Sequence, residues 1–599
     1  MTMAARSRAG WTWLTCGLAG LAFVAGVQAQ SGSIRSQLKF EEIGTQAGVR
    51  FVHSTRKFTG KHKADVLQMF TDGGAAVAVG DYNNDGFDDL FVVDSDTGKP
   101  HHLMRNNGDW TFTEVTQSAG VGGGNDALSI CGDALWLDYN NDGWLDLLVG
   151  RFGTPILYRN EGPDQEGKHR FTDVSQAAGL TQFGNTIGMI AFDADRDGWL
   201  DLLLGHYFQP VNLLDLKTPH VLPNNLDYAD NGGGVTFWRN VPLPDGGRGF
   251  VDVTQAAGFA HHTGWTLDLG HADLNNDGWQ DVYLAGDYGT DRLFMNKADG
   301  SGTFVEVTET AIGFDTRKGM NVDIGDFNRD GWLDIYVTNI TDEYMKECNM
   351  LWHNNGDGTF IDLSRETGTC DTDWGWAAKF ADFDNDGWED LFALNGLRSA
   401  GEQNYIPVLL EMIITPGIDF SDINSYPDIG NMTWSGYQKQ RLFHNMGDGT
   451  FKEVGAAAGA DNHLDGRGLG VADFNNDGFL DVYQTNANQP ALLLRGKPEN
   501  PGNWVELKLI GTTSNRDAIG ARVIVTAAGE SYLREVNGGN GYAGQSTTRL
   551  HFGLGRAPQI DKVEIRWPNG QVETLPPQQT AKLINTFAYV REGKGVMSK

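Results

Sequence analysis

The sequence is short of positive charge and of cysteine, and both shortages exclude functions. Lys and Arg number 46 against 78 Asp and Glu, which leaves a formal net charge of −32. A chain this acidic is a poor binder of nucleic acid phosphates, because that binding depends on Lys and Arg. The 599 residues hold four cysteines, and no Cys or His pairs have the spacing of zinc ligands. A P-loop and a nucleophile elbow are also absent from the sequence.

Long apolar runs are lacking beyond the N-terminus. Residues 1–29 combine Arg6 and Arg8, an apolar stretch from Trp11 to Ala25 and the cleavage-like Val27-Gln28-Ala29, as in a secretory signal peptide. The alternative is an uncleaved membrane anchor, for which the apolar stretch is short. No later segment is long and apolar enough to span a membrane. The sequence therefore predicts an exported, periplasmic or extracellular protein, with residues 30–39 as a linker.

One motif dominates the rest of the chain. From Asp81 to Leu90, Asp stands at positions 1, 5 and 9, Asn at position 3, Gly at position 6 and an apolar residue at position 10. Alternate side chains of a tight turn converge on one centre, and calcium takes six to eight oxygen ligands. This is the first half of an EF-hand loop, except that Asp89 replaces the glutamate of position 12 and a strand-like run follows it. The motif predicts a short calcium loop between two strands.

The same motif starts at seven places. A single copy could equally be a solvated Asn/Asp turn, but seven copies in phase with other repeated features favour up to seven Ca²⁺ sites. A backbone carbonyl at position 7 and water would complete each coordination shell. The predicted ligands are Asp81, Asn83, Asp85 and Asp89; Asp138, Asn140, Asp142 and Asp146; Asp193, Asp195, Asp197 and Asp201; Asp273, Asn275, Asp277 and Asp281; Asp326, Asn328, Asp330 and Asp334; Asp382, Asp384, Asp386 and Asp390; and Asp473, Asn475, Asp477 and Asp481.

Two further patterns recur around each loop. A strand opening with Phe, as in Phe40-Glu41-Glu42-Ile43, is followed by a short turn, and a Leu-x-x-Asn segment leads into an Asp-Gly turn, as in Leu351 to Phe360. One unit thus contains four short strands, and seven units average roughly 65 residues, the period of propeller blades. The predicted fold is all-β, a seven-bladed β-propeller from residue 40 to 497, and the 79 Gly and 17 Trp suit it.

Two units are longer than the others. Insertions at about 204–237 and 397–440 contain prolines, aromatic residues and a helix-like segment from Ile406 to Ile414, and such loops on a rigid repeat are often functional. Trp374 and Trp376, just before one calcium loop, are expected to pack between blades. From residue 503 to 592 the calcium motif stops and alternating strands predict a small separate β domain, followed by a tail at 593–599.

These patterns resemble a known family. The repeats are similar to FG-GAP/VCBS repeats, which also form integrin α-subunit heads, and the last domain resembles the ASPIC/UnbV domain. The matching segments there are Asn515 and Ile519 to Val523, Arg534-Glu535-Val536, Gly541 to Gln545, His551 to Gly555, and Trp567 to Gly570. The chain as a whole resembles the cartilage acidic protein family and its bacterial relatives. The resemblance implies an extracellular calcium-binding interaction protein with no established reaction.

Cysteine and histidine offer little further chemistry. Cys348 and Cys370 flank a predicted hairpin, and export favours a disulfide between them, with two buried thiols as the alternative. Cys131 is expected to be a buried thiol. The pairs His101-His102 and His261-His262 lack the spacing of metal ligands and are expected to be exposed in loops.

Two functions remain compatible with the sequence. The first is an adhesion-type module that binds an unknown protein or glycan, with Ca²⁺ as a structural ion. The second is an enzyme with its site on the propeller face or the insertions, acting on sugars or a secondary metabolite. The first is favoured, because no catalytic constellation is visible and a fold alone supplies no chemistry. The sequence does not specify the oligomeric state.

Overall fold

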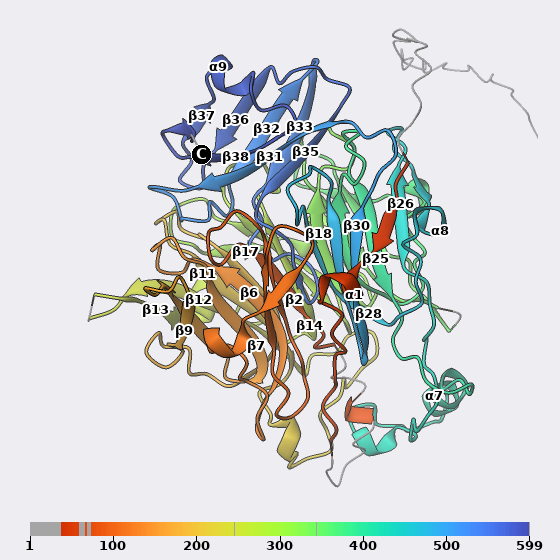
Figure 1. Cartoon of the computed structure of the whole chain (residues 1–599). Helices are drawn as coiled ribbons and strands as arrows, with labels where there is room; N and C mark the ends of the chain where they lie inside the picture. The colour runs from red at the N-terminus through yellow and green to blue at the C-terminus, as the bar shows by residue number, and fades with distance from the viewer. Residues whose placement is uncertain (1–36, 59–65, 69–72, 245, 343, 598–599) are drawn as a thin grey trace, which may run out of the picture. The chain divides into compact units, whose positions relative to one another are not determined.

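The computed structural model describes residues 37–58, 66–68, 73–244, 246–342 and 344–597 (Figure 1). The predicted signal peptide and most of the predicted linker lie outside these residues. Nearly all described elements are strands, so the predicted all-β fold class is confirmed. Among the described residues, no helix combines the length and the apolar character needed to cross a membrane.

The strands follow one another in antiparallel sets of four. The first three sets are β2 (Val77–Gly80), β3 (Asp89–Val92), β4 (His102–Asn106) and β5 (Phe112–Glu114); β6 (Ile130–Leu137), β7 (Asp146–Gly153), β8 (Ile156–Pro163) and β9 (His169–Asp173); and β10 (Gly184–Phe192), β11 (Asp201–Phe208), β12 (Gly232–Pro242) and β13 (Arg248–Asp252). The next two are β14 (Thr266–Ala272), β15 (Asp281–Gly286), β16 (Arg292–Asn296) and β17 (Phe304–Glu306); and β18 (Asn321–Gly325), β19 (Asp334–Thr338), β22 (Met350–Asn354) and β23 (Phe360–Asp362). The last two are β24 (Gly375–Ala381), β25 (Asp390–Asn395), β26 (Arg441–Asn445) and β27 (Phe451–Glu453); and β28 (Gly466–Ala472), β29 (Asp481–Asn486), β30 (Gln489–Gly496) and β1 (Phe40–Glu42).

The last set is completed by the first strand of the chain. Phe40 of β1 pairs with Gly496 of β30, so residues more than 450 positions apart share one sheet. The sequence analysis placed each Phe strand at the start of a unit, but the structure makes it the outer strand of the preceding set. The first strands contact one another in the closed order β2, β6, β10, β14, β18, β24, β28 and back to β2. This arrangement places the first strands inside the ring and leaves only the short outer strand of each set as an exposed sheet edge.

One-turn helices follow most of the Phe strands, where the sequence predicted a turn. Each of five ends at a glycine with a left-handed backbone, such as Gly120 at φ 83°, which L side chains rarely adopt. The helices are α1 (Gly44–Ala47), α3 (Thr116–Ala119), α4 (Thr254–Ala257), α5 (Thr308–Ala311), α6 (Ser364–Thr367) and α8 (Gly455–Ala458).

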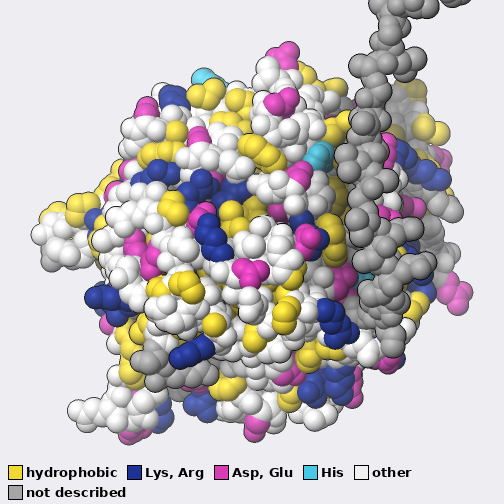
Figure 2. All heavy atoms as spheres, turned by 90° about the horizontal axis from the view of Figure 1, so that it is seen from above, with side chains coloured by type: hydrophobic (Ala, Val, Ile, Leu, Met, Phe, Trp, Pro, Cys, Tyr) yellow, Lys and Arg dark blue, Asp and Glu magenta, His cyan; other side chains and the backbone are white. Residues whose placement is uncertain are grey.

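The C-terminal domain consists of two four-stranded sheets, ordered β35-β31-β38-β39 and β33-β32-β36-β37. Residues 595–596, predicted to be part of a tail, form β39 against β38. On the face shown in Figure 2, Lys and Arg side chains are interspersed with Asp and Glu, so the net negative charge does not make that face uniformly acidic. The elements are β31 (Asn503–Ile510), β32 (Arg522–Ala527), β33 (Glu530–Glu535), β35 (Leu550–Gly555), β36 (Lys562–Arg566), β37 (Val572–Thr574), α9 (Pro577–Thr580), β38 (Thr586–Arg591) and β39 (Gly595–Val596).

The sequence analysis predicted a separate domain, but the structure shows that part of its chain packs within the repeats. Between β33 and β35 the chain leaves the domain and enters the ring of first strands. There β34 (Gly544–Gln545) pairs in parallel with β2, and Tyr542 is fully buried. We call residues 537–548 the plug segment. The sequence suggested only a Gly- and Asn-rich turn here, because partners of the segment such as Trp136 and His271 lie more than 250 residues away.

The two insertions meet each other in space. The Val221 N–H donates to the Ser421 carbonyl at 3.0 Å, and the Ile423 N–H donates to the Pro219 carbonyl at 3.0 Å. The insertions carry η1 (Leu213–Asp215), α7 (Ile406–Ile413), close to the predicted helical segment, and η2 (Ile423–Ser425). A small hairpin of β20 (Thr341–Asp342) and β21 (Met345–Lys346) adds to the loops of the fifth set. Segments 200 residues apart thus support each other.

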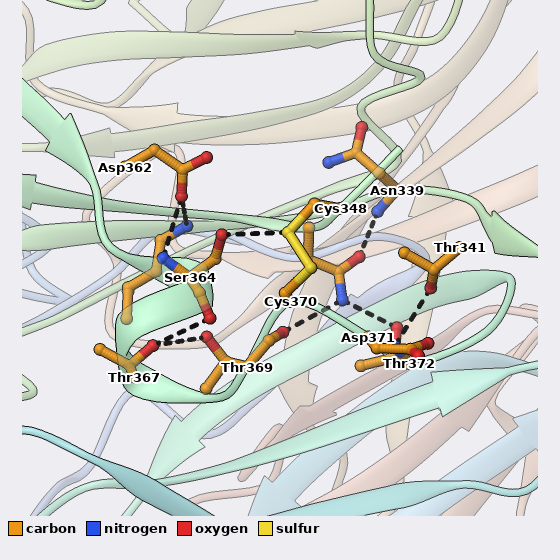
Figure 3. Close-up of a disulfide and its surroundings, with 12 residues drawn as sticks. Asn339, Thr341, Cys348, Asp362, Ser364, Thr367, Thr369, Cys370, Asp371 and Thr372 are labelled. Atoms are coloured by element: carbon orange, nitrogen blue, oxygen red, sulfur yellow. Dashed lines mark hydrogen bonds between the residues drawn. A yellow bond between two sulfur atoms is a disulfide. The ribbon is translucent and has the colours of Figure 1, made fainter. Parts of the chain in front are cut away.

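Cys348 and Cys370 form the predicted disulfide. Their α-carbons are 4.7 Å apart, and the bridge ties the start of β22 to the loop before β24 (Figure 3). The Asn349 side chain beside it donates to the Thr372 hydroxyl at 2.9 Å. Cys131 is a buried free thiol, also as predicted.

Candidate metal centres

All seven predicted loops have one backbone conformation. The residue at position 4 is left-handed in each, with φ between 56° and 61°, and the glycine at position 6 has φ between 86° and 96°. In each loop the position 6 N–H donates to the carboxylate at position 1, and the position 7 N–H donates to the carboxylate at position 5. These bonds turn the acidic side chains inward, so the repeated sequence is also a repeated site.

The position 9 aspartates are almost completely buried in all seven loops. Each is at most 1% exposed. One oxygen accepts an N–H from the neighbouring strand, from Asn106 at 2.7 Å in the case of Asp89. The other oxygen of Asp89, Asp146 and Asp334 has no partner among the described residues. Burial raises the pKa of Asp334 to about 7, although the hydrogen bond and the charge of His353 act to lower it.

Two loops bring three carboxylates especially close together. Ligand oxygens of Asp193, Asp195 and Asp197 lie within 4.8 Å of one another, and so do those of Asp382, Asp384 and Asp386. These are the two loops with Asp at position 3. Carboxylates at this separation repel each other unless a cation or protons compensate their charge. Together with the unpartnered position 9 oxygens, this donor set of hard oxygens fits a calcium-like cation.

Some loops already hold a cationic side chain. In the third loop, Arg239 pairs with Asp195. In the fourth loop, Arg522 and Arg566 of the C-terminal domain both pair with Asp273. The positive charge of these side chains neutralises part of the carboxylate charge that a metal ion would otherwise neutralise. The seven centres are therefore not equivalent, although their ligand residues are.

Neighbouring loops are linked through position 4, which the sequence analysis did not single out. The Asn84 side chain donates to the Gly143 carbonyl of the next loop at 2.8 Å, and Asn476 of the last loop donates to Gly86 of the first at 2.9 Å. Asn141, Asn276 and Asn385 do the same. The two remaining loops have Arg196 and Arg329, which stack on Trp279 and Trp388 of the next loop. The sequence did contain a signal for these links, because five of the seven copies have Asn at position 4, which has no ligand role.

The Leu-x-x-Asn asparagines make a second link. The Asn160 side chain donates to the Leu145 carbonyl of its own loop at 3.1 Å and to the Tyr82 carbonyl of the preceding loop at 3.0 Å. The corresponding asparagines of the other sets reach back in the same way. Each of these asparagines therefore connects two neighbouring loops, so a change in the conformation of one loop affects the next.

The C-terminal domain docks against these loops. Arg549 is 2% exposed in its side chain, and its Nε lies 3.2 Å from the Asp88 carboxylate. Its other nitrogens donate to Asn476 and to the Gly86 carbonyl, so one guanidinium contacts the last and the first loop. On the second loop, the Asp138 N–H donates to Asp517 at 2.7 Å. The candidate metal centres thus form part of an interdomain interface.

His261 is exposed in a turn, as predicted, but His101, His102 and His262 are less exposed than the sequence analysis expected. His101 is completely buried, and burial lowers its pKa to about 3. Its Nδ1 accepts the Asp94 N–H at 3.2 Å. His262 is half-buried and bonds to the Thr266 hydroxyl at 2.8 Å. Both histidines therefore have structural hydrogen bonds rather than free ring nitrogens on these atoms.

Comparisons with known proteins agree with this architecture. The FG-GAP-like repeat model matches residues 138–204, 273–337, 341–393 and 426–483, and the ASPIC and UnbV model matches residues 511–588. Cartilage acidic protein 1 of Mus musculus is 26% identical over 457 residues, which cover 67% of this chain and 66% of that protein. The Homo sapiens protein is 26% identical over 481 residues, covering 73% of this chain and 68% of its own length. The chain thus spans about two thirds of the length of these relatives.

Solved structures give more distant likenesses. A Bacillus licheniformis rhamnogalacturonan lyase is 12% identical, with a TM-score of 0.35, and covers 76% of this chain and 75% of its own. BBS1N in complex with ARL6DN is 9% identical, with a TM-score of 0.37, and covers 74% and 95%. Likenesses this weak say nothing about a ligand or an activity. The family matches and the curated relatives identify the chain as an FG-GAP-like repeat protein with a C-terminal ASPIC and UnbV domain, related to cartilage acidic protein 1.

Proposed function

We propose that the protein is an exported, calcium-binding propeller that serves as an extracellular protein- or glycan-binding module, with Ca²⁺ as a structural ion. One observation carries the calcium part. Seven loops share one backbone conformation, and three of them leave a fully buried carboxylate oxygen without a partner among the described residues. An oxygen-rich, anionic donor set of this kind is typical of calcium sites.

The ion's role would be to compensate charge. When bound, calcium supplies the positive charge that the acidic side chains of each loop require. The loop residues themselves orient the donors, since the position 6 and position 7 N–H groups hold the carboxylates at positions 1 and 5. The position 4 and Leu-x-x-Asn contacts would then pass the stabilisation of one loop on to the next. Export would support this function, because extracellular calcium matches affinities of about 10⁻⁴ to 10⁻³ M.

Thermal unfolding tests the proposal. The purified protein is melted in 10 mM calcium, in 10 mM magnesium and in excess chelator. At a hundredfold excess over the dissociation constant, each site contributes about 2.7 kcal/mol of stability, so chelator should lower the melting temperature sharply. Magnesium should restore it poorly, because it prefers a smaller, octahedral shell that retains water.

Matched variants localise the effect. Asp330→Asn keeps the side-chain shape but removes a loop charge and should reduce the calcium-dependent gain. Asp357→Asn makes the same change in an exposed Asp-Gly turn outside the loops and should leave the gain unchanged. Equal melting temperatures in calcium and in chelator would refute the structural role of calcium.

A further inference from the structure

A cavity lies on the ring axis at the face opposite the calcium-type loops. It has a volume of about 60 Å³. Its lining residues lie mainly near the start of the first strand or the end of the second strand of their sets. Its lining includes Tyr207 of β11, Asp287 and Tyr288 after β15, Trp374 before β24, Trp434 of the second insertion and Tyr542 of the plug segment. The plug segment therefore closes the cavity on one side, and the insertions border it on the other.

The aromatic lining is fixed by its own contacts. The Trp374 and Trp434 rings pack edge to face with centroids 5.6 Å apart. The Tyr542 hydroxyl donates to the Gly73 carbonyl at 3.1 Å, and its ring lies 5.1 Å from that of Trp376. The sequence analysis expected Trp374 and Trp376 only to pack between blades. Rings that are held in place before a ligand arrives bind it at lower entropic cost.

A single carboxylate lies within this lining. Asp287 is 8% exposed, and one of its oxygens accepts the Tyr207 hydroxyl. Among the described residues, its other oxygen has no hydrogen-bond partner, and no Lys, Arg or His forms an ion pair with it. The nearby Lys318 ammonium forms an ion pair with Glu347 at 2.8 Å and donates a hydrogen bond to the Thr316 carbonyl at 2.9 Å. Asp287 is therefore a buried acid without an ion-pair partner among the described residues, although the charge of Lys318 acts on it from a distance.

The combination of lining and charge selects one ligand chemistry. Aromatic rings attract cations through their quadrupoles, and a buried carboxylate adds the complementary charge. A neutral sugar could stack on the rings but would leave the carboxylate charge uncompensated. At 10–15 Å³ per water-sized position, the cavity has room for about four to six non-hydrogen atoms. That is the size of a methylated ammonium or a guanidinium group.

We propose that this cavity binds a small organic cation, an alkylammonium or trimethylammonium group, with Asp287 as counter-ion and the aromatic lining around the charge. The proposal rests on the proposed role as a binding module and names the chemistry of its ligand, but it does not require metal in the loops. The group could be a free solute or the end of a larger ligand, such as a basic side chain of a partner protein.

The test uses tetramethylammonium as the probe, titrated into the calcium-replete protein and followed by calorimetry and tryptophan fluorescence. The neutral control is tert-butanol, which has similar size and no charge, and methyl glucoside tests the glycan alternative. Tetramethylammonium should bind at least tenfold more tightly than either. Equal binding of tetramethylammonium and tert-butanol, no binding of tetramethylammonium, or preference for the sugar would each overturn the proposal.

Two variants and one control place the ligand in this cavity. Asp287→Asn removes the charge without changing shape and should weaken tetramethylammonium at least tenfold, while tert-butanol binding stays unchanged. Trp434→Leu provides a second variant if the first does not fold. Asp330→Asn in a calcium-type loop should leave tetramethylammonium binding unchanged, so that failure of the metal proposal and failure of this one remain distinguishable. Unchanged affinity in the folded variants at Asp287 and Trp434 would contradict the assignment.

The pH profile gives an independent readout. Burial raises the pKa of Asp287 to about 7, against the lowering effects of the Tyr207 hydrogen bond and the Lys318 charge and with a raising effect of Glu347. Because tetramethylammonium carries no titrating proton, its affinity should rise roughly tenfold between pH 6 and pH 8. The Asp287→Asn variant should show no such rise. A flat profile in the unmodified protein would contradict the role of Asp287.

Discussion

The Gln545 side chain pairs with the Trp136 backbone as a second strand would. Its carbonyl oxygen accepts the Trp136 N–H at 2.7 Å, and its amide donates to the Trp136 carbonyl at 2.9 Å. Gln545 belongs to the plug segment and Trp136 to β6, so one side chain joins the C-terminal domain to the second strand set. Gln545 is 2% exposed, and water does not replace these bonds.

Replacing Gln545 with Ala should therefore destabilise both parts of the molecule. The change leaves a buried N–H and a buried carbonyl unpaired, which costs roughly 2 to 4 kcal/mol. Thermal unfolding measured by circular dichroism checks this, with Gln571→Ala, an exposed glutamine of the same domain, as the control. If the two variants melt at the same temperature, the plug segment does not contribute to stability.

The position 4 links predict a contrast between two asparagines with the same backbone. Asn84 is exposed with φ 57°, and Asn385 is buried with φ 61° and also bonds to His551 at 2.7 Å. Replacement by Ala imposes the same backbone strain at both, so the difference reports the side-chain bonds. Asn385→Ala should cost roughly 2 to 3 kcal/mol more than Asn84→Ala, as judged by denaturant unfolding. Equal losses would show that the links contribute little.

Local patterns in the sequence sufficed for the strands, the loop motif and α7, because each of these depends on neighbours in the chain. They did not reveal what depends on distant partners. The Phe40 strand has the pattern of a unit opening, yet its hydrogen-bond partner is Gly496. Asn537 to Gly541 has turn composition, but the ring encloses it because Tyr542 and Gln545 find buried partners there. His101 is held partly in this way, since its Nδ1 accepts the Asp94 N–H and the Asp94 carbonyl in turn accepts the side-chain amide of Asn125, a residue of a later loop.

Removal of the disulfide should destabilise the fifth and sixth strand sets. Cys348 and Cys370 are 22 residues apart, and a closed loop of this length contributes about 3 kcal/mol by restricting the unfolded chain. The Cys348→Ser and Cys370→Ser double variant should lower the unfolding midpoint under oxidising conditions. Cys131→Ser is the control for loss of a thiol. Reductant should lower the midpoint of the unmodified protein and leave that of the double variant in place.

The hydrogen bonds of Glu592 predict how the stability of the C-terminal domain depends on acidic pH. Its carboxylate accepts the N–H groups of Thr512, Thr513 and Ser514 at 2.6, 2.8 and 3.1 Å, and also the Asn569 amide at 2.6 Å. Burial alone would raise the pKa of Glu592, but these hydrogen bonds outweigh it and lower the pKa to about 2.

Because the ordinary glutamate pKa of about 4.3 applies to the unfolded chain, the ionised group stabilises the folded state above that pH. The contribution should be fully present at neutral pH and should disappear as the pH falls from about 4.5 to 2. Glu592→Gln should therefore be destabilised at pH 7, and the gap to the unmodified protein should close over that interval. Urea unfolding at several pH values measures the gap, with Glu573→Gln, another glutamate of the same domain, as the control. A gap that stays constant down to pH 2 would mean that the three N–H groups do not hold Glu592 ionised.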